Sequence, residues 1–189
     1  MYGNSGSLPR VESQAPDPIA PYAVAKLAAE RYCVSFSRVY PLETVALRYF
    51  NVFGPGQNPH SQYAAVVPRF ISAIAAGEPV PVYGDGEQSR DFTYVGNVVS
   101  ANLLAAGAEA VNGEILNIAS GRSETVNDLA ALLGRILDRP VEKEFLPERT
   151  GDVRHSWADV SAARRLLRYE PEVAFEEGLR LTADAFVGV

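Results

Sequence analysis

Residues 21–38 read PYAVAKLAAERYCVSFSR, and this stretch predicts a long helix over about residues 22–38. Pro21 suits the first turn of a helix, because the N–H that it lacks would have no partner there. Tyr22 and Lys26 stand four positions apart, so their side chains project from one face and can meet. The spacing alone is weak evidence, because a half-buried tyrosine beside a solvated lysine is the ordinary alternative.

Strands alternate with helices outward from this segment. Residues 43–50 (ETVALRYF) and 115–119 predict buried strands, and short strands are expected in the VPVYGDG and DFTYV segments between 80 and 95. The other expected helices are 63–76, with Pro68 as a kink or late start, 97–108, 125–137 with Thr125 or Ser123 as its cap, 160–167 and 175–186. This order predicts an α/β protein with a smaller α/β lobe. Only two candidates for a long parallel sheet are present, so the other strands of a doubly wound sheet are expected before residue 1.

The composition opposes several classes of partner. The formal net charge is −6 and the chain has two lysines, whereas proteins that bind nucleic acid cluster many basic side chains. No apolar run approaches the roughly 20 residues that a membrane helix needs, and the N-terminus lacks the apolar core of a signal peptide. We therefore expect a cytoplasmic protein that binds neither nucleic acid nor membrane.

The thiol and the imidazoles predict neither a disulfide nor a metal site. Cys33 is the single cysteine, and we expect it to be a small buried helix residue. His60 and His155 are too few and too isolated to suggest a metal cluster.

The PYAVAK hexapeptide resembles the Tyr-x-x-x-Lys signature of the extended short-chain dehydrogenases/reductases, and its proline is similar to that of their nucleotide-sugar epimerases. The resemblance implies NAD as the cofactor, Tyr22 as the base that takes a sugar hydroxyl proton, and Lys26 as the residue that binds the nicotinamide ribose. A free phenol has a pKa of about 10 and is a poor base at neutral pH. A neighbouring ammonium group favours the phenolate.

The RYFNVFGP segment at 48–55 resembles the UDP-glucose 4-epimerases. The resemblance implies that Tyr49 lies near the nicotinamide and that Asn51 binds the pyrophosphate of the nucleotide sugar. Pro81 and Tyr83 match a stretch whose aromatic residue packs beside the nucleotide base. Taken without the resemblance, the first segment is a buried aromatic strand that ends in a turn.

Two arginine segments match the same family, the NAD-dependent epimerase/dehydratase family. Arg90 in SRDFTYV matches an arginine that binds phosphate. In the Arg-Thr-Gly-Asp segment, the resemblance implies that Arg149 binds phosphate and that Asp152 binds ribose hydroxyls. A guanidinium group suits phosphate because it can donate two parallel hydrogen bonds. Each arginine considered by itself is more often a surface cation.

Ser156 falls four residues after Asp152 and just before Trp157. In the relatives that the chain resembles, this position faces the C2 substituent of the sugar, and a small residue leaves room for an N-acetyl group. The resemblance therefore implies a UDP-hexose or UDP-N-acetylhexosamine substrate. The alternative is a loop residue that precedes a core tryptophan.

The sequence contains no G-x-G-x-x-G segment after a strand, so the usual pyrophosphate cradle of a dinucleotide site is missing. By the resemblance, the chain is expected to be N-terminally truncated. Residues 1–54 would be the C-terminal part of a dinucleotide-binding Rossmann domain. Residues 55–189 would form mainly the nucleotide-sugar lobe, with about 90–120 packing back on the Rossmann part.

The main functional hypothesis is a nucleotide-sugar 4-epimerase that acts through transient NAD-dependent oxidation at sugar C4 and is inactive as this fragment alone. A second hypothesis is a non-catalytic protein that binds a nucleotide sugar or another subunit. A third is a decarboxylase or dehydratase of the same superfamily. A homodimer is possible for the full-length protein, since the family usually pairs through the Tyr-x-x-x-Lys helix.

Overall fold

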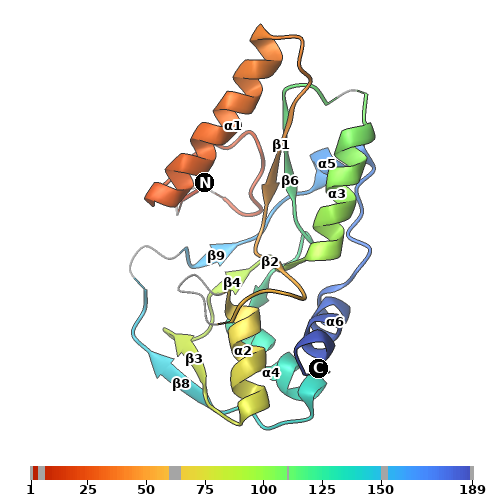
Figure 1. Cartoon of the computed structure of the whole chain (residues 1–189). Coiled ribbons are helices and arrows are strands. Elements are labelled where there is room, and N and C mark those ends of the chain that lie inside the picture. The colour runs from red at the N-terminus through yellow and green to blue at the C-terminus, as the bar shows by residue number, and fades with distance from the viewer. Residues whose placement is uncertain (1, 4–6, 60–64, 110, 150–152, 188–189) are drawn as a thin grey trace.

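The computed structural model describes residues 2–3, 7–59, 65–109, 111–149 and 153–187 (Figure 1). The helices are α1 (Pro21–Val39), α2 (Val66–Ala76), α3 (Val95–Gly107), α4 (Val126–Leu137), α5 (Ser161–Leu167) and α6 (Phe175–Val187). The strands are β1 (Val45–Tyr49), β2 (Val52–Phe53), β3 (Val80–Tyr83), β4 (Ser89–Arg90), β5 (Thr93–Tyr94), β6 (Glu114–Ile118), β7 (Glu124–Thr125), β8 (Lys143–Leu146) and β9 (His155–Ser156). The expected α/β class is confirmed.

The longest strand pair is parallel and lies between layers of helices. β1 pairs with β6, with Val45 opposite Glu114 and Tyr49 opposite Ile118. Figure 1 shows α1 on one side of this pair and α3 and α5 on the other. Parallel strands need a crossover connection, and here the segment between β1 and β6 contains α2, α3 and the four short strands β2 to β5.

The remaining strands are short and pair mostly with distant segments. β2 pairs with β5 and β3 pairs with β8, both in parallel. β4 lies between β7, which is antiparallel to it, and β9, which is parallel. The two short strands expected around one turn at 80–95 therefore do not pair with each other in the described part of the chain, because each finds a partner elsewhere in the sequence.

The helix α1 lies largely outside the hydrophobic core. Its buried residues are Glu30 and Val34, and it begins at Pro21 as the sequence predicts. Cys33, which we expected to be buried, is only half-buried. Most of this helix is therefore exposed, including the turn that carries Tyr22 and Lys26.

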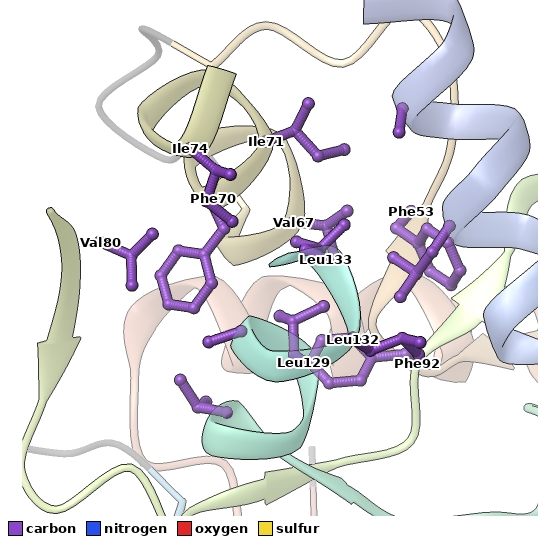
Figure 2. Close-up of a cluster of buried hydrophobic side chains, with 14 of the residues drawn as sticks. Phe53, Val67, Phe70, Ile71, Ile74, Val80, Phe92, Leu129, Leu132 and Leu133 are labelled. Atoms are coloured by element: carbon purple, nitrogen blue, oxygen red, sulfur yellow. The ribbon is translucent and has the colours of Figure 1, made fainter. Parts of the chain in front are cut away.

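One hydrophobic cluster fills the space between α2, α4, α6 and β3 (Figure 2). Its fully buried members include Phe53, Phe70, Ile71, Leu129 and Leu133. The helix α4 begins with a capping box, in which Thr125 accepts from the Asp128 backbone N–H at 2.9 Å and Asp128 accepts from the Thr125 N–H at 3.2 Å. Thr125, one of the two expected caps, is therefore confirmed.

A second hydrophobic cluster packs the β1–β6 pair against α3 and α5. Its buried members include Phe50, Leu116, Ile118, Ala163 and Tyr169. The buried residues Ala158, Val160, Ala163, Leu167 and Tyr169 of the segment around α5 belong to this cluster as well. The reason is that α5 lies directly against β6.

Candidate active site

Tyr22 and Lys26 lie on successive turns at the start of α1. The Lys26 Nζ lies 5.4 Å from the centroid of the Tyr22 ring, so the prediction that the two side chains meet is confirmed. Both side chains are exposed, Tyr22 by 74%. They line a pocket of about 530 Å³, together with the whole of β1.

Residues from three parts of the chain other than α1 complete this larger pocket. Tyr2 and Gly3 come from the N-terminal segment, Tyr49 from the end of β1, and Val153 and Ser156 from the region of β9. The pocket is large enough for a small ring system.

Asn51 is the residue at which this pocket meets a second one. It lines both pockets, is exposed, and has a φ angle of +21°, which residues other than glycine rarely adopt and asparagine tolerates better than most. Its carbonyl oxygen accepts a hydrogen bond from the Thr93 N–H at 3.2 Å. The turn between β1 and β2 is therefore held by β5, as functional turns often are.

The second pocket has a volume of about 190 Å³ and contains no carboxylate in its described lining. It brings together five residues that the sequence proposed for substrate binding, which are Asn51, Pro81, Tyr83, Arg90 and Arg149. Arg69 lines it too, from the first turns of α2. Three guanidinium groups around one small pocket favour an anionic ligand.

Arg149 lies over the Tyr83 ring, with its Cζ atom 3.8 Å from the ring centroid. Hydrogen bonds from Arg149 first, and then from Arg69, hold the pKa of the Tyr83 phenol below its usual value. The sequence reasoning missed Arg69. Arg69 lies near the start of α2 and belongs to no motif, so the sequence gave no signal for it. Only the fold, which brings it close to Tyr83, identifies it.

Three of the tyrosines have pKa values that the fold shifts in different directions. Burial raises the pKa of Tyr2 and of Tyr169, whereas the two arginines lower that of Tyr83. We expect Tyr83 to ionise before Tyr2 and Tyr169 as the pH rises, so Tyr83→Phe should remove phenolate absorbance from the first step of the titration. Tyr32→Phe, on the exposed face of α1, is the control. An unchanged first step in Tyr83→Phe would contradict the assignment.

Arg90 and Ser156 lie opposite each other on neighbouring strands, although they face different pockets. The Arg90 Nη1 donates to the backbone carbonyls of Ser89 and Arg154 at 2.8 and 3.1 Å. The Asp91 N–H donates to the Ser156 carbonyl at 2.7 Å. The β4–β9 pairing thus sets the positions of both side chains together.

Asp91 is a fully buried carboxylate directly behind this pairing. Its Oδ1 accepts from the Ser120 N–H at 2.8 Å and the Ser120 hydroxyl at 2.6 Å. Its Oδ2 accepts from the Gly121 and Ala158 N–H groups at 3.1 and 3.3 Å. Burial raises the pKa of Asp91, while these four bonds lower it. The carboxylate therefore ties three chain segments together behind the site.

Tyr49 lines the larger pocket, but its hydroxyl is directed to α3. It donates to the Asn102 Oδ1 at 2.9 Å, and Tyr49 lies on the same face of β1 as Val45 and Leu47. The Tyr49 hydroxyl therefore bonds to α3 and not to Tyr22.

Asp152, together with the Thr150 and Gly151 of its segment, lies outside the described residues. Within the residues that are described, no three His, Cys, Asp or Glu side chains gather as a metal site requires. His155 instead pairs its Nδ1 with the Ser89 hydroxyl at 3.0 Å. None of the helices in the described part of the chain is both long and apolar enough to cross a membrane.

Comparison with known proteins gives a consistent result. The model of the NAD dependent epimerase/dehydratase family matches residues 1–119. A UDP-glucose 4-epimerase of Mycolicibacterium smegmatis is 35% identical over 186 residues, which are 98% of this chain and 59% of that protein. A UDP-N-acetyl-alpha-D-glucosaminuronate decarboxylase of Bacillus cytotoxicus is 35% identical over 172 residues, with 87% of this chain and 52% of that protein covered.

Solved structures match over nearly the whole chain. The Thermotoga maritima UDP-glucose 4-epimerase with UDP-glucose has a TM-score of 0.93 and 44% identity, and covers 98% of this chain and 59% of its own. The Methanobrevibacter ruminantium UDP-N-acetylglucosamine 4-epimerase, in complex with UDP-N-acetylmuramic acid, has a TM-score of 0.94 and 45% identity, with 99% and 60% covered. The chain therefore spans about 60% of the length of that structure.

Proposed function

The chain belongs to the NAD dependent epimerase/dehydratase family, and from this premise we propose that it carries the catalytic pair and most of the substrate pocket of a UDP-sugar 4-epimerase. The observation that carries the proposal is the meeting of two pockets at Asn51. One pocket holds an exposed Tyr22–Lys26 pair, and the other holds three arginines. A sugar joined to a nucleoside diphosphate fits these two pockets in order, with the neutral sugar in the Tyr22–Lys26 pocket and the phosphates in the arginine pocket.

Tyr22 takes the proton of the sugar C4 hydroxyl and later returns it. The ammonium group of Lys26, close to the ring, stabilises negative charge on the tyrosine oxygen. Proton transfer of this kind typically contributes about 10²–10⁴-fold to the rate. In the other pocket, Arg90, Arg149 and Arg69 bind the diphosphate and so fix the sugar within reach of Tyr22.

The residues present fit one end of NAD. Tyr22 and Lys26 place a hydroxyl and an ammonium group beside an open pocket, which suits the nicotinamide ribose. When bound, NAD supplies reversible hydride transfer at the sugar carbon. The sequence offers no glycine-rich loop for the pyrophosphate at the other end. We therefore propose turnover for this chain when it is joined to a segment that has such a loop. We call this joined chain the extended protein.

The chain alone should bind UDP without retaining NAD. Bonds to charged groups contribute about 1.5–3 kcal/mol each, so Arg149→Ala and Arg69→Ala should each raise the Kd for UDP roughly tenfold or more. Titration calorimetry measures the Kd, and release of nicotinamide nucleotide on denaturation measures retained NAD. Arg180→Ala, on the surface of α6, is the control. Unchanged UDP binding in both pocket variants, or stoichiometric NAD in the chain alone, would contradict the proposal.

A uronate decarboxylase is the second candidate, because one relative of similar identity bears such a name. The two reactions differ in their products, since decarboxylation releases CO₂ and shortens the sugar. Incubating the extended protein with UDP-glucose, UDP-N-acetylglucosamine and their uronates, and identifying products by NMR, separates them. An extended protein that binds UDP but converts none of these sugars would favour the non-catalytic hypothesis.

Ser156 should determine whether acetylated sugars are accepted. It is half-buried and lines the larger pocket, so a tyrosine there would fill space near the sugar. Overpacking typically costs about 1–3 kcal/mol, enough for a roughly tenfold change in rate. We expect Ser156→Tyr to lower kcat/KM for UDP-N-acetylglucosamine at least that much relative to UDP-glucose. Ser161→Tyr, at the exposed start of α5, is the control. An equal ratio in Ser156→Tyr and parent would remove Ser156 from the sugar site.

A further inference from the structure

A buried ion pair joins α1 to β1 in the wall of the larger pocket, whose lining includes both residues. The Arg48 Nε donates to the Glu30 Oε2 at 2.6 Å, and the Arg48 Nη2 donates to the Glu30 Oε1 at 2.9 Å. Both side chains are almost completely buried, with 4% of Arg48 and 3% of Glu30 exposed. Two parallel bonds between planar groups fix relative orientation as well as distance.

A third donor of Arg48 extends this contact into a network. Its Nη1 donates to the Tyr2 hydroxyl at 2.6 Å, and that hydroxyl donates to the Asn117 Oδ1 at 2.6 Å. The Asn117 Nδ2 in turn donates to the Arg10 carbonyl at 3.0 Å. Helix α1 is thus connected through one guanidinium group to β1, β6 and the N-terminal segment.

The rest of the packing of α1 is thin. Glu30 and Val34 are its buried residues, and a single side chain such as Val34 restrains rotation poorly because apolar contacts have no preferred direction. Glu30 follows Lys26 by one turn and Tyr22 by two, so the three side chains lie on neighbouring turns. The ion pair is therefore the side-chain contact that orients this end of the helix on the sheet, while the Thr44 hydroxyl donates to the Cys33 carbonyl at 2.8 Å nearer the other end.

Rotation of α1 would act directly on the reactive groups. Side-chain tips lie about 6 Å from a helix axis, so a roll of roughly 20° moves them by about 2 Å. A displacement of about 1 Å at a reacting group can lower a rate by about 10²-fold. An apolar pair in place of the ions could hold the helix equally strongly, but without a defined angle.

We propose that Glu30 and Arg48 are positioning residues, which set the rotation of α1 on β1 and thereby the place of Tyr22 and Lys26 in the pocket. The inference rests on the proposed function for its catalytic consequence. Its structural part, the fixed rotation of the helix, stands on the hydrogen bonds and burial alone.

The single cysteine provides a reporter of this rotation in the 189-residue chain. Cys33 lies on α1, lines the larger pocket and is half-buried, so a helix without a fixed angle would sample rotations in which its thiol is more exposed. We expect a thiol reagent to modify Glu30→Leu/Arg48→Met at least about tenfold faster than the parent, since a change of that size exceeds the effect of ordinary loosening of a helix. Glu30→Gln, which keeps the side-chain volume, serves if the double variant does not fold.

Leu116→Ala is the matched control for lost stability. Leu116 is fully buried in β6, in the hydrophobic cluster that packs the β1–β6 pair against α3 and α5. It takes no part in the hydrogen bonds of Arg48. Rates are compared at temperatures where all variants are equally folded by circular dichroism. Modification of the ion-pair variants no faster than that of Leu116→Ala overturns the fixed rotation.

The catalytic part is tested in the extended protein. A folded ion-pair variant should lose at least about tenfold in kcat, with the KM for the UDP-sugar within about threefold of the parent, because the arginine pocket is untouched. Leu116→Ala should keep its kcat when folded. Parent-like kcat in a folded ion-pair variant overturns the positioning role whatever the thiol rate. If the parent itself converts no sugar, the proposed function fails, and the Cys33 rates still decide whether the pair sets the rotation of the helix.

Discussion

Replacing Tyr22 with phenylalanine should lower the kcat of the extended protein about 10²–10⁴-fold, the usual contribution of a general base. The substitution removes the hydroxyl that exchanges a proton with the sugar and leaves the ring in place. Binding of the UDP-sugar should change little, because the arginines that hold the diphosphate line the other pocket. Steady-state kinetics gives kcat, and titration calorimetry gives the Kd.

Tyr32→Phe on the same helix is the matched control. Tyr32 is 68% exposed and lies outside the described lining of both pockets, so its hydroxyl should contribute nothing to turnover. If Tyr22→Phe and Tyr32→Phe gave the same kcat as the parent, Tyr22 would not be the base, and the catalytic assignment would have to move to another residue.

Replacing Asp91 with asparagine should lower the free energy of unfolding by about 2–4 kcal/mol. The amide keeps one acceptor oxygen, but its NH₂ group faces N–H donors that had shared the other carboxylate oxygen. Each buried donor left without an acceptor costs about 1–3 kcal/mol. The affected donors are the Gly121 and Ala158 N–H groups if the NH₂ group replaces Oδ2, or the Ser120 N–H and hydroxyl if it replaces Oδ1. Urea denaturation at neutral pH measures the change.

Asp85→Asn is the control for Asp91→Asn. The Asp85 carboxylate forms an ion pair with Arg154 at 2.6 Å, but both side chains are about half exposed, at 52% and 51%. Surface pairs of this kind contribute little because water screens them. We expect Asp85→Asn to unfold at nearly the same urea concentration as the parent. Equal urea midpoints for Asp91→Asn and Asp85→Asn would show that the buried Asp91 bonds stabilise the fold no more than the surface ion pair does.

Local sequence signals predicted the helices well. Pro21 marked the start of α1, Thr125 the cap of α4, and Gly77 the end of α2, where its φ angle of +72° confirms a left-handed cap. These signals work because each depends on hydrogen bonds within a few residues of one another.

Strand partners were harder to predict because they depend on contacts between distant segments. β8 has the sequence KEFL, whose two charged residues do not indicate a strand, and it forms one only beside β3. The two-residue strands β4 and β9 likewise have no recognisable strand pattern in the sequence, although their pairing fixes the positions of Arg90 and Ser156. Arg69 was missed for the same reason, since only the fold brings α2 to Tyr83.

The two hydrophobic clusters have no residue in common among the residues that the structure describes. The chain passes from one to the other between Phe50 and Phe53, and Asn51 lies within that passage. Each cluster can therefore act as a separate cooperative unit that opens on its own. A ligand that spans both pockets would touch the two units at once, so its binding energy would couple their opening and make the molecule unfold as a single unit.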